Sequence, residues 1–136
     1  MNEPGPLLGG TLVFLGSGVG GLLRHALGSA IQHAWGPRFP LGTLAVNVSG
    51  CLVMGLCIGA WLGTTPMRED FRLAILIGVL GGYTTFSSFG RDFFLLASEG
   101  AWARAMTYAL LSVVFSLLAV WAGAAAAHRV FGEGVV

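Results

Sequence analysis

The chain contains four long apolar segments, each long enough to cross a lipid bilayer as an α-helix. They run from Leu7 to Ile31, from Gly42 to Leu62, from Phe71 to Ala97 and from Trp102 to Ala127. A helix needs about 20 predominantly apolar residues to span the hydrocarbon core. We therefore predict an all-α membrane protein with four transmembrane helices, forming a single domain over residues 1–136.

Charged residues are too few to cover the surface of a soluble domain of this size. The 136 residues include seven arginines, no lysine and six acidic residues, and 55% are hydrophobic. A net charge of +1 without a basic patch argues against nucleic acid as a partner. The sequence has no Ser/His/Asp set, metal-ligand cluster or phosphate-binding loop, so we expect no enzymatic activity. Cys51 and Cys57 are expected to be two buried free thiols.

The arginines give too small a bias to fix one orientation in the membrane. One side is expected to carry Arg68, Arg72 and Arg129, and the other Arg38 and Arg104, with Arg91 ambiguous. The positive-inside rule needs a clear excess of positive charge on one side. A chain without that excess can insert both ways, which favours an oligomer and allows an antiparallel one.

Pairs of glycines four residues apart indicate close helix packing. They are Gly16 and Gly20, Gly55 and Gly59, and Gly78 and Gly82. This spacing puts both glycines on one helix face, where their lack of a side chain lets two helix backbones approach in lipid. We interpret these pairs as packing sites rather than functional ones.

Polar residues form stripes on three of the four segments. Their spacings of three and four residues put the members of each stripe on one helix side: Thr43 and Asn47; Thr85, Ser88 and Asp92; Tyr108, Ser112 and Ser116. Two hypotheses remain open for these residues. They are either hydrogen-bonding contacts between helices, or the lining of a pathway through the membrane.

If the stripes line a pathway, their chemistry suits a small anion. A cation route normally has a carboxylate within the membrane, whereas the only acid inside a segment is Asp92, toward one end. We therefore expect hydroxyls and the Asn47 amide to act as donors with no buried acid beside them. The ring edges of Phe86 and Phe89 add positive electrostatic potential. Arg24 either reaches the membrane interface or lies in a water-filled vestibule, where it concentrates anions.

The stretch GGYTTFSSFG, residues 81–90, predicts a break in the third helix. Gly81, Gly82 and the residues Tyr83 to Thr85 are poor helix formers placed near the middle of the segment. A break frees backbone carbonyls at membrane depth, where protein, water or an ion must satisfy them. A hard cation such as Na⁺ is one candidate, and a close helix crossing is the alternative reading of the glycines.

Three motifs in this order, GVGGLLRHALG, GTLAVNVSG and GGYTTFSSFGRD, resemble the Fluc (CrcB-like) family of fluoride channels. The resemblance covers nearly the whole chain. It implies an antiparallel, dual-topology homodimer with two pores that exports fluoride passively from the cytoplasm and so lowers its toxicity. It also implies a location in the cell (inner) membrane of a prokaryote.

The resemblance further assigns roles to individual positions. It implies a central structural Na⁺, not transported, held by the backbone carbonyls of Gly81 and Thr84 of both subunits. Arg24 matches the vestibule arginine. The positions that match the pore or extend its polar stripes are Thr43, Asn47, Thr85, Phe86, Ser88, Phe89, Tyr108, Ser112 and Ser116. Two positions depart from the family pattern, because Asp92 stands where relatives often carry a glutamate and Tyr83 replaces a smaller apolar residue.

Two other function classes remain as alternatives. Small proton-coupled drug transporters also use four helices and antiparallel dimers, but they need a glutamate in the first span, and residues 7–31 contain no acid. A non-transporting assembly subunit would use the polar stripes for packing alone. Selective efflux of fluoride from liposomes separates these classes from a fluoride channel.

Overall fold

The computed structural model describes residues 5–62 and 68–131, with residues 61 and 62 described by their backbone only. It is entirely helical over these residues. The helices in chain order are α1 (Pro6–Trp35), α2 (Leu41–Leu62), α3 (Glu69–Phe71), the π-helix η1 (Arg72–Leu80), α4 (Gly81–Tyr83), α5 (Phe86–Ser98) and α6 (Trp102–Phe131). The residues GTTPMRED suggest Thr65 as the N-cap and Pro66 as the first residue of the third helix, and both lie outside the described residues.

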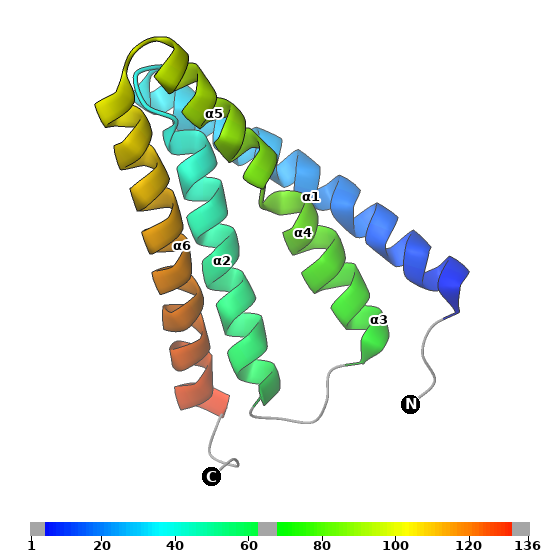
Figure 1. Cartoon of the computed structure of the whole chain (residues 1–136). Helices are drawn as coiled ribbons and strands as arrows, with labels where there is room; N and C mark the ends of the chain where they lie inside the picture. Colours follow the sequence, from blue (N-terminus) through cyan, green and yellow to red (C-terminus); the bar gives the residue numbers. More distant parts are fainter. Residues whose placement is uncertain (1–4, 63–67, 132–136) are drawn as a thin grey trace.

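The helices form four membrane-spanning units, as the sequence predicts. The candidate spans are Pro6–Trp35, Leu41–Ala60, Glu69–Ser98 and Trp102–Phe131. The predicted bounds differ from them by no more than a turn or so at each end. The four spans run alternately up and down, so both ends of the chain lie on the same side of the bundle (Figure 1). α2 packs mainly along α6, and α1 packs mainly along η1.

The glycine pairs lie at these helix contacts, which confirms the packing interpretation. A Cβ on Gly16 would come within 2.9 Å of the Gly78 Cα, and one on Gly82 within 2.7 Å of the Ser17 Cα. On the other contact, a Cβ on Gly55 would come within 2.9 Å of the Val120 carbonyl carbon. Each distance is far below van der Waals contact, so only glycine allows these backbones to approach so closely.

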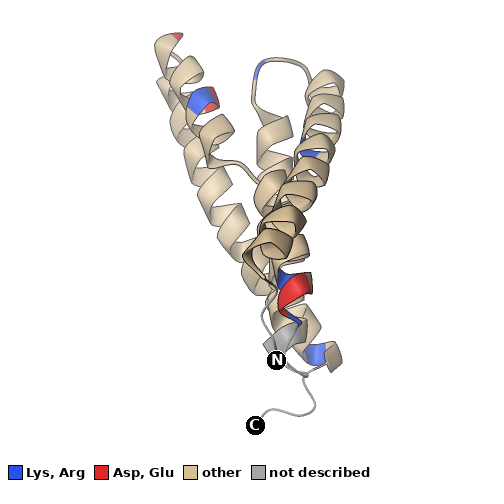
Figure 2. Ribbon diagram, turned by 90° about the vertical axis from the view of Figure 1, so that its right-hand side faces the viewer, with Lys and Arg blue, Asp and Glu red and all other residues tan. Residues whose placement is uncertain are grey.

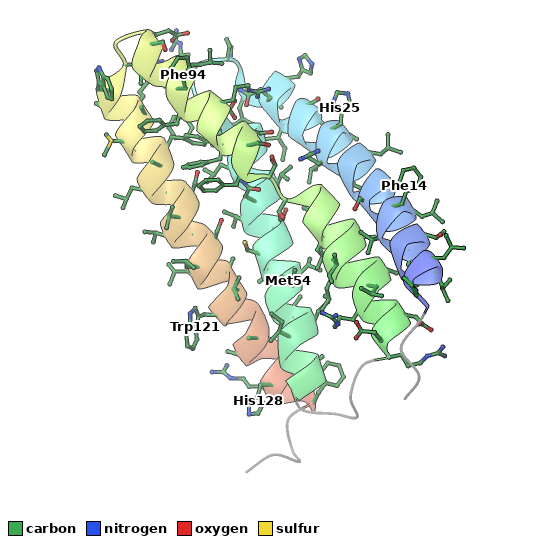
Figure 3. The ribbon with its side chains drawn as sticks, turned by 45° about the vertical axis from the view of Figure 1, so that its right-hand side comes forward. Phe14, His25, Met54, Phe94, Trp121 and His128 are labelled. Carbon is green, nitrogen blue, oxygen red and sulfur yellow. The ribbon has the colours of Figure 1, made fainter. Side chains whose placement is uncertain are left out.

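The outer surface of the bundle is apolar, as expected for a protein solvated by lipid tails. Phe14, Phe94 and Trp121 point away from the helices (Figure 3) and are each more than half exposed. The buried core is small and includes Val46, Leu96, Ala105 and Tyr108. Trp35 and Trp102 are exposed at helix ends, where an aromatic belt lies. The Trp61 side chain lies outside the described residues.

The charged residues gather toward the two ends of the bundle (Figure 2). Arg91, whose side the sequence leaves open, lines the same cavity as Pro37, Pro40 and Glu99 and so belongs to the end that carries Arg38. Arg24 lines this cavity as well, so this end carries four arginines (Arg24, Arg38, Arg91 and Arg104), and the other end carries Arg68, Arg72 and Arg129. The difference of one arginine is too small to favour one orientation.

The third span is the irregular one. Its helix stops after Tyr83, and Thr84 (φ −78°, ψ 156°) and Thr85 (φ −153°, ψ 119°) are extended before α5 begins at Phe86. This confirms the break predicted from GGYTTFSSFG. The sequence does not anticipate η1, which has nine residues of π-helix before the break. Nothing in the residues RLAILIGVL marks that segment as different from an ordinary α-helix.

Candidate functional site

Two threonines form the break in the third span and start the next helix. Thr85 is the N-cap of α5, and its Oγ1 accepts a hydrogen bond from the Ser88 N–H at 3.1 Å. Threonine is well suited to this position, because its hydroxyl satisfies a backbone donor that the first helical turn leaves free. The Thr84 hydroxyl donates back to the Leu80 carbonyl at 3.0 Å and so closes the end of α4.

Asn47 on α2 holds the break in place through two hydrogen bonds. Its Nδ2 donates to the Thr85 carbonyl at 3.0 Å, and its Oδ1 accepts from the Thr85 N–H at 2.8 Å. The amide is the one side-chain group that can donate and accept side by side in this way. Asn47 therefore replaces hydrogen bonds that the broken helix cannot make for itself (Figure 1 shows the break beside α2).

The break withdraws the usual helical donors from the backbone carbonyls of residues 81–84, among them those of Gly81 and Thr84. In a continuous helix the Thr85 N–H would bond the Gly81 carbonyl, and the Ser88 N–H would bond the Thr84 carbonyl. Here the Thr85 N–H donates to Asn47, and the Ser88 N–H donates to the Thr85 hydroxyl. Both carbonyls are thus available as oxygen ligands, and these are the two positions that the sequence analysis assigns to Na⁺.

A groove of about 270 Å³ lies beside the break and gathers much of the predicted site. Seven of its ten lining residues are predicted site residues. They are Asn47, Thr84, Thr85, Phe86, Phe89, Ser112 and Ser116, and the others are Cys51, Val113 and Leu117. The groove joins residues from α2, the break, α5 and α6. The polar stripes of three spans therefore converge on one place.

Ser112 is the most informative residue of this groove. Its side chain is buried, with 5% exposure, and its Oγ makes no hydrogen bond of normal geometry within the part of the chain that the structure describes. The Tyr108 hydroxyl is the polar group close enough to interact with it. An unsatisfied buried hydroxyl costs about 1–3 kcal/mol, so a small movement that brings these two hydroxyls together is favourable.

The expectation that no buried acid accompanies the donors is wrong. Asp92 is only 8% exposed, and its Oδ2 accepts from the Thr43 hydroxyl at 2.6 Å and from the Tyr108 hydroxyl at 3.5 Å. Its Oδ1 accepts from the Arg91 guanidinium at 2.7 Å and 3.0 Å. The Thr43 and Tyr108 hydroxyls are therefore contacts between helices at this point, as the packing hypothesis holds.

The two phenylalanines of the predicted site stand at the edge of the groove. The Phe86 ring is 82% exposed, and its centroid lies 5.2 Å from that of Phe89. Phe89 in turn packs on Tyr108 at 5.3 Å. Tyr108 thus supports the rings from behind and does not itself line the groove. An aromatic ring as exposed as Phe86 adds little to the stability of one subunit.

A larger cavity of about 600 Å³ lies on the other side of Thr85, toward the end with the α1–α2 connector. Arg24 lines it, together with four members of the polar stripes, Thr43, Thr85, Ser88 and Asp92. This position agrees with the vestibule hypothesis for Arg24. Thr85 lines both the cavity and the groove, so the two lie on opposite sides of this buried residue.

The sequence reasoning missed several residues of this region. Ser49 contacts the Tyr83 hydroxyl at 2.8 Å, and Arg91 pairs with Asp92. Cys51 lines the groove, and both cysteines are half-buried free thiols rather than fully buried ones. Cys51 follows Asn47 by four residues, so the helical spacing that defines the stripes would have found it had thiols been counted as polar.

Comparison with known proteins identifies relatives over most of the chain. The family model for CrcB-like protein, Camphor Resistance (CrcB), matches residues 11–124. A fluoride-specific ion channel FluC of Solibacter usitatus is 43% identical over 118 residues, covering 87% of this chain and 97% of the relative. Fluoride-specific ion channel FluC 2 of Nitrobacter hamburgensis is 44% identical over 114 residues, covering 84% and 92%. A third, the FluC of Sphingopyxis alaskensis, is 45% identical over 111 residues, covering 82% and 88%.

The match covers most of each of the four spans and all residues that line the groove and the larger cavity. The order of the motifs, the broken third span and the sequence identity to full-length relatives agree with one another. The chain therefore belongs to the CrcB-like family.

Proposed function

We propose that the chain is a fluoride-specific channel that lets fluoride leave the cytoplasm down its gradient. Family membership and relatives named as fluoride-specific ion channels support this function. The observation in this chain that carries the proposal is the groove beside the break, where Asn47, Ser116 and the two phenylalanines come together from three of the four spans. This family conducts ions and has no enzymatic role.

Fluoride is small and strongly hydrated, so a path must replace its water with hydrogen-bond donors placed in series. Ser112 and Ser116 stand one helical turn apart on α6, and both residues line the groove. The Asn47 amide has two N–H donors, of which the Thr85 carbonyl takes one. The Phe86 and Phe89 ring edges add positive potential where water is excluded. No fixed positive charge lines the groove, which permits fast release.

On the proposed path, fluoride meets Arg24, Thr85 and Ser88 in the larger cavity before it reaches the groove. Arg24 attracts anions into the larger cavity, where the Thr85 and Ser88 hydroxyls also face. Thr43 and Tyr108 act indirectly, since their hydroxyls hold Asp92 and Tyr108 supports the Phe89 ring. The proposed path runs from the cavity past Thr85 into the groove.

The working unit is an antiparallel homodimer with two such paths. One subunit leaves Phe86 and the Gly81 backbone exposed beside a groove that is open on one side, which suits closure by a second copy. The near-equal numbers of arginines at the two ends, four and three, support insertion in both orientations. The bacterial relatives support an inner-membrane location.

A structural Na⁺ fits between the two subunits. The carbonyls of Gly81 and Thr84 have lost their usual helical donors, and carbonyl oxygens are suitable ligands for a hard cation. When bound, the ion would supply a fixed positive centre between the two paths. It would not move with fluoride. The two hydrogen bonds between Asn47 and the Thr85 backbone would keep these carbonyls in place for the ion.

Ion-selective electrodes on loaded liposomes test the function directly. Vesicles with the purified protein are filled with equal fluoride and chloride, and a K⁺ ionophore balances the charge. Fluoride should leave while chloride stays, without a proton gradient. Equal leak of both anions, or none, contradicts the proposal. Drug efflux that requires a proton gradient would support the antiporter class, although α1 contains no acid among residues 6–35. If the protein transports neither anions nor drugs, the remaining alternative is a non-transporting assembly subunit.

A further inference from the structure

The Tyr83 side chain connects the end of α4 to α2 by a directed hydrogen bond. Its hydroxyl lies 2.8 Å from the Ser49 Oγ. The Ser49 hydroxyl has a single hydrogen, which it donates to the Val46 carbonyl at 3.1 Å. Ser49 is therefore the acceptor of the pair, and the Tyr83 O–H donates to it. Val46 is 1% exposed, so this chain of bonds ends at a buried residue of α2.

Close backbone contacts on both sides fix the same short segment. On the α2 side, a Cβ on Gly50 would come 3.0 Å from the Tyr83 ring and would collide with the Thr84 methyl group. On the α1 side, a Cβ on Gly20 would come 2.7 Å from the Tyr83 nitrogen. Gly82 and Tyr83, the two residues between Gly81 and Thr84, are thus held between α1 and α2. The Tyr83 hydroxyl adds a hydrogen bond to α2 to these contacts.

We propose that Tyr83 is a positioning residue that sets the cation affinity of the break. The inference rests on the proposed function, since it concerns the Na⁺ that the Gly81 and Thr84 carbonyls would hold. Asn47 fixes the segment after the break and Ser49 fixes the segment before it, through bonds from one face of α2. Among the described residues, the side chains of Asn47 and Tyr83 are the two hydrogen-bonded links between this segment and α2. Without the Tyr83 link, the relative position of the Gly81 and Thr84 carbonyls is less well fixed. The ion must then do more of the ordering itself and binds less tightly.

The test measures sodium binding by the purified dimer without using transport. The melting temperature is followed as sodium replaces N-methylglucamine at constant ionic strength, because a ligand that binds the folded state raises it. Tyr83→Phe removes the hydroxyl alone and should raise the half-saturating sodium concentration about fivefold, the effect of one lost hydrogen bond. Ser49→Ala should do the same. The double variant should be no worse than either single one, since both remove the same bond.

A matched control separates positioning from a general loss of a hydroxyl. Ser98 also donates to a carbonyl of its own helix, that of Phe94, but lies at the far end of α5. Ser98→Ala should leave the sodium midpoint unchanged. Saturating sodium should return Tyr83→Phe to the wild-type fluoride efflux rate, which a misfolded or blocked protein would not do.

The possible outcomes are distinct. Sodium midpoints that match wild type in both Tyr83→Phe and Ser49→Ala overturn the inference and leave Tyr83 as a packing residue. A wild-type protein whose melting temperature and efflux ignore sodium overturns the cation part of the proposed function, and this inference with it. A wild type that binds sodium but moves no fluoride overturns the transport function. The role of Tyr83 is then decided by the half-saturating sodium concentrations of Tyr83→Phe and Ser49→Ala alone.

Discussion

Asn47 and Thr85 exchange two hydrogen bonds across 38 positions of sequence, at 2.8 Å and 3.0 Å, and so join α2 to the break in the third span. The exchange has two consequences. It satisfies the Thr85 backbone in a region where water is scarce. It also takes the N–H that would otherwise bond the Gly81 carbonyl. A single amide therefore both stabilises the break and leaves the Gly81 carbonyl without its usual helical donor.

Replacement of Asn47 by alanine should impair both proposed roles. The Thr85 N–H and carbonyl would lose their partner, at a cost of about 1–3 kcal/mol for each buried group left unsatisfied. We expect a lower melting temperature, weaker sodium binding and a large loss of fluoride efflux, with the dimer retained. Asn47→Asp is the matched control, because it keeps the acceptor and loses the donors. If Asn47→Ala conducts like wild type, Asn47 is a packing residue and the path lies elsewhere.

Phe86→Ala should abolish most fluoride efflux with little effect on folding. The ring is 82% exposed in one subunit, so its removal creates no cavity in the subunit core. Phe14 is a suitable control, because it is 76% exposed and points away from the bundle on α1. We expect Phe14→Ala to conduct normally. Electrode traces of both variants at matched protein density provide the comparison, and equal efflux rates would remove Phe86 from the path.

Asp92→Ala should destabilise the protein more than a change at a surface carboxylate. It would leave the Thr43 and Tyr108 hydroxyls without their shared acceptor, and Tyr108 is fully buried. Asp70→Ala breaks only an ion pair in which the Arg68 side chain is 82% exposed, and such pairs are worth about 0–1 kcal/mol. Thermal denaturation in detergent should show the larger loss for Asp92→Ala. Equal melting temperatures would mean that the Asp92 contacts add no net stability.

The contact between α2 and α6 should depend on Gly123, which is not a member of the glycine pairs spaced four residues apart. A Cβ on Gly123 would come 2.8 Å from the Leu56 nitrogen and would force the two helices apart. Gly123→Ala should therefore lower the melting temperature and reduce the yield of dimer. Gly90 has open space where its Cβ would lie, and Gly90→Ala should be neutral or slightly stabilising. A stable Gly123→Ala would show that the helix contact can adjust at low cost.

Much of this architecture follows from local sequence patterns. The four spans follow from runs of apolar residues, the glycine contacts from four-residue spacing, and the break from GGYTTFSSFG. The polar stripes also identified most of the groove. The sequence could not reveal which side chains meet across helices. Asp92 was read as lying toward a helix end, yet its burial follows from Thr43 and Tyr108 arriving from two other helices. The π-helix and the Tyr83–Ser49 bond likewise arise only when the helices pack.

The two cysteines offer a final test of the path, since only one of them lines the groove. Cys51 belongs to the groove beside Asn47, whereas Cys57 lies further along α2 and lines neither hollow. Methyl methanethiosulfonate is small and uncharged, and a thiolate that attacks it forms a methyl disulfide and expels methanesulfinate. The added methylthio group on Cys51 should occupy part of the groove and slow fluoride efflux severalfold. Cys57→Ala should remain sensitive to the reagent, and Cys51→Ala should become resistant. Reduction should restore the rate, because the disulfide is reversible. Mass spectrometry of each sample shows which thiol reacted. A Cys51 that carries the group while efflux continues unchanged would place fluoride on another route.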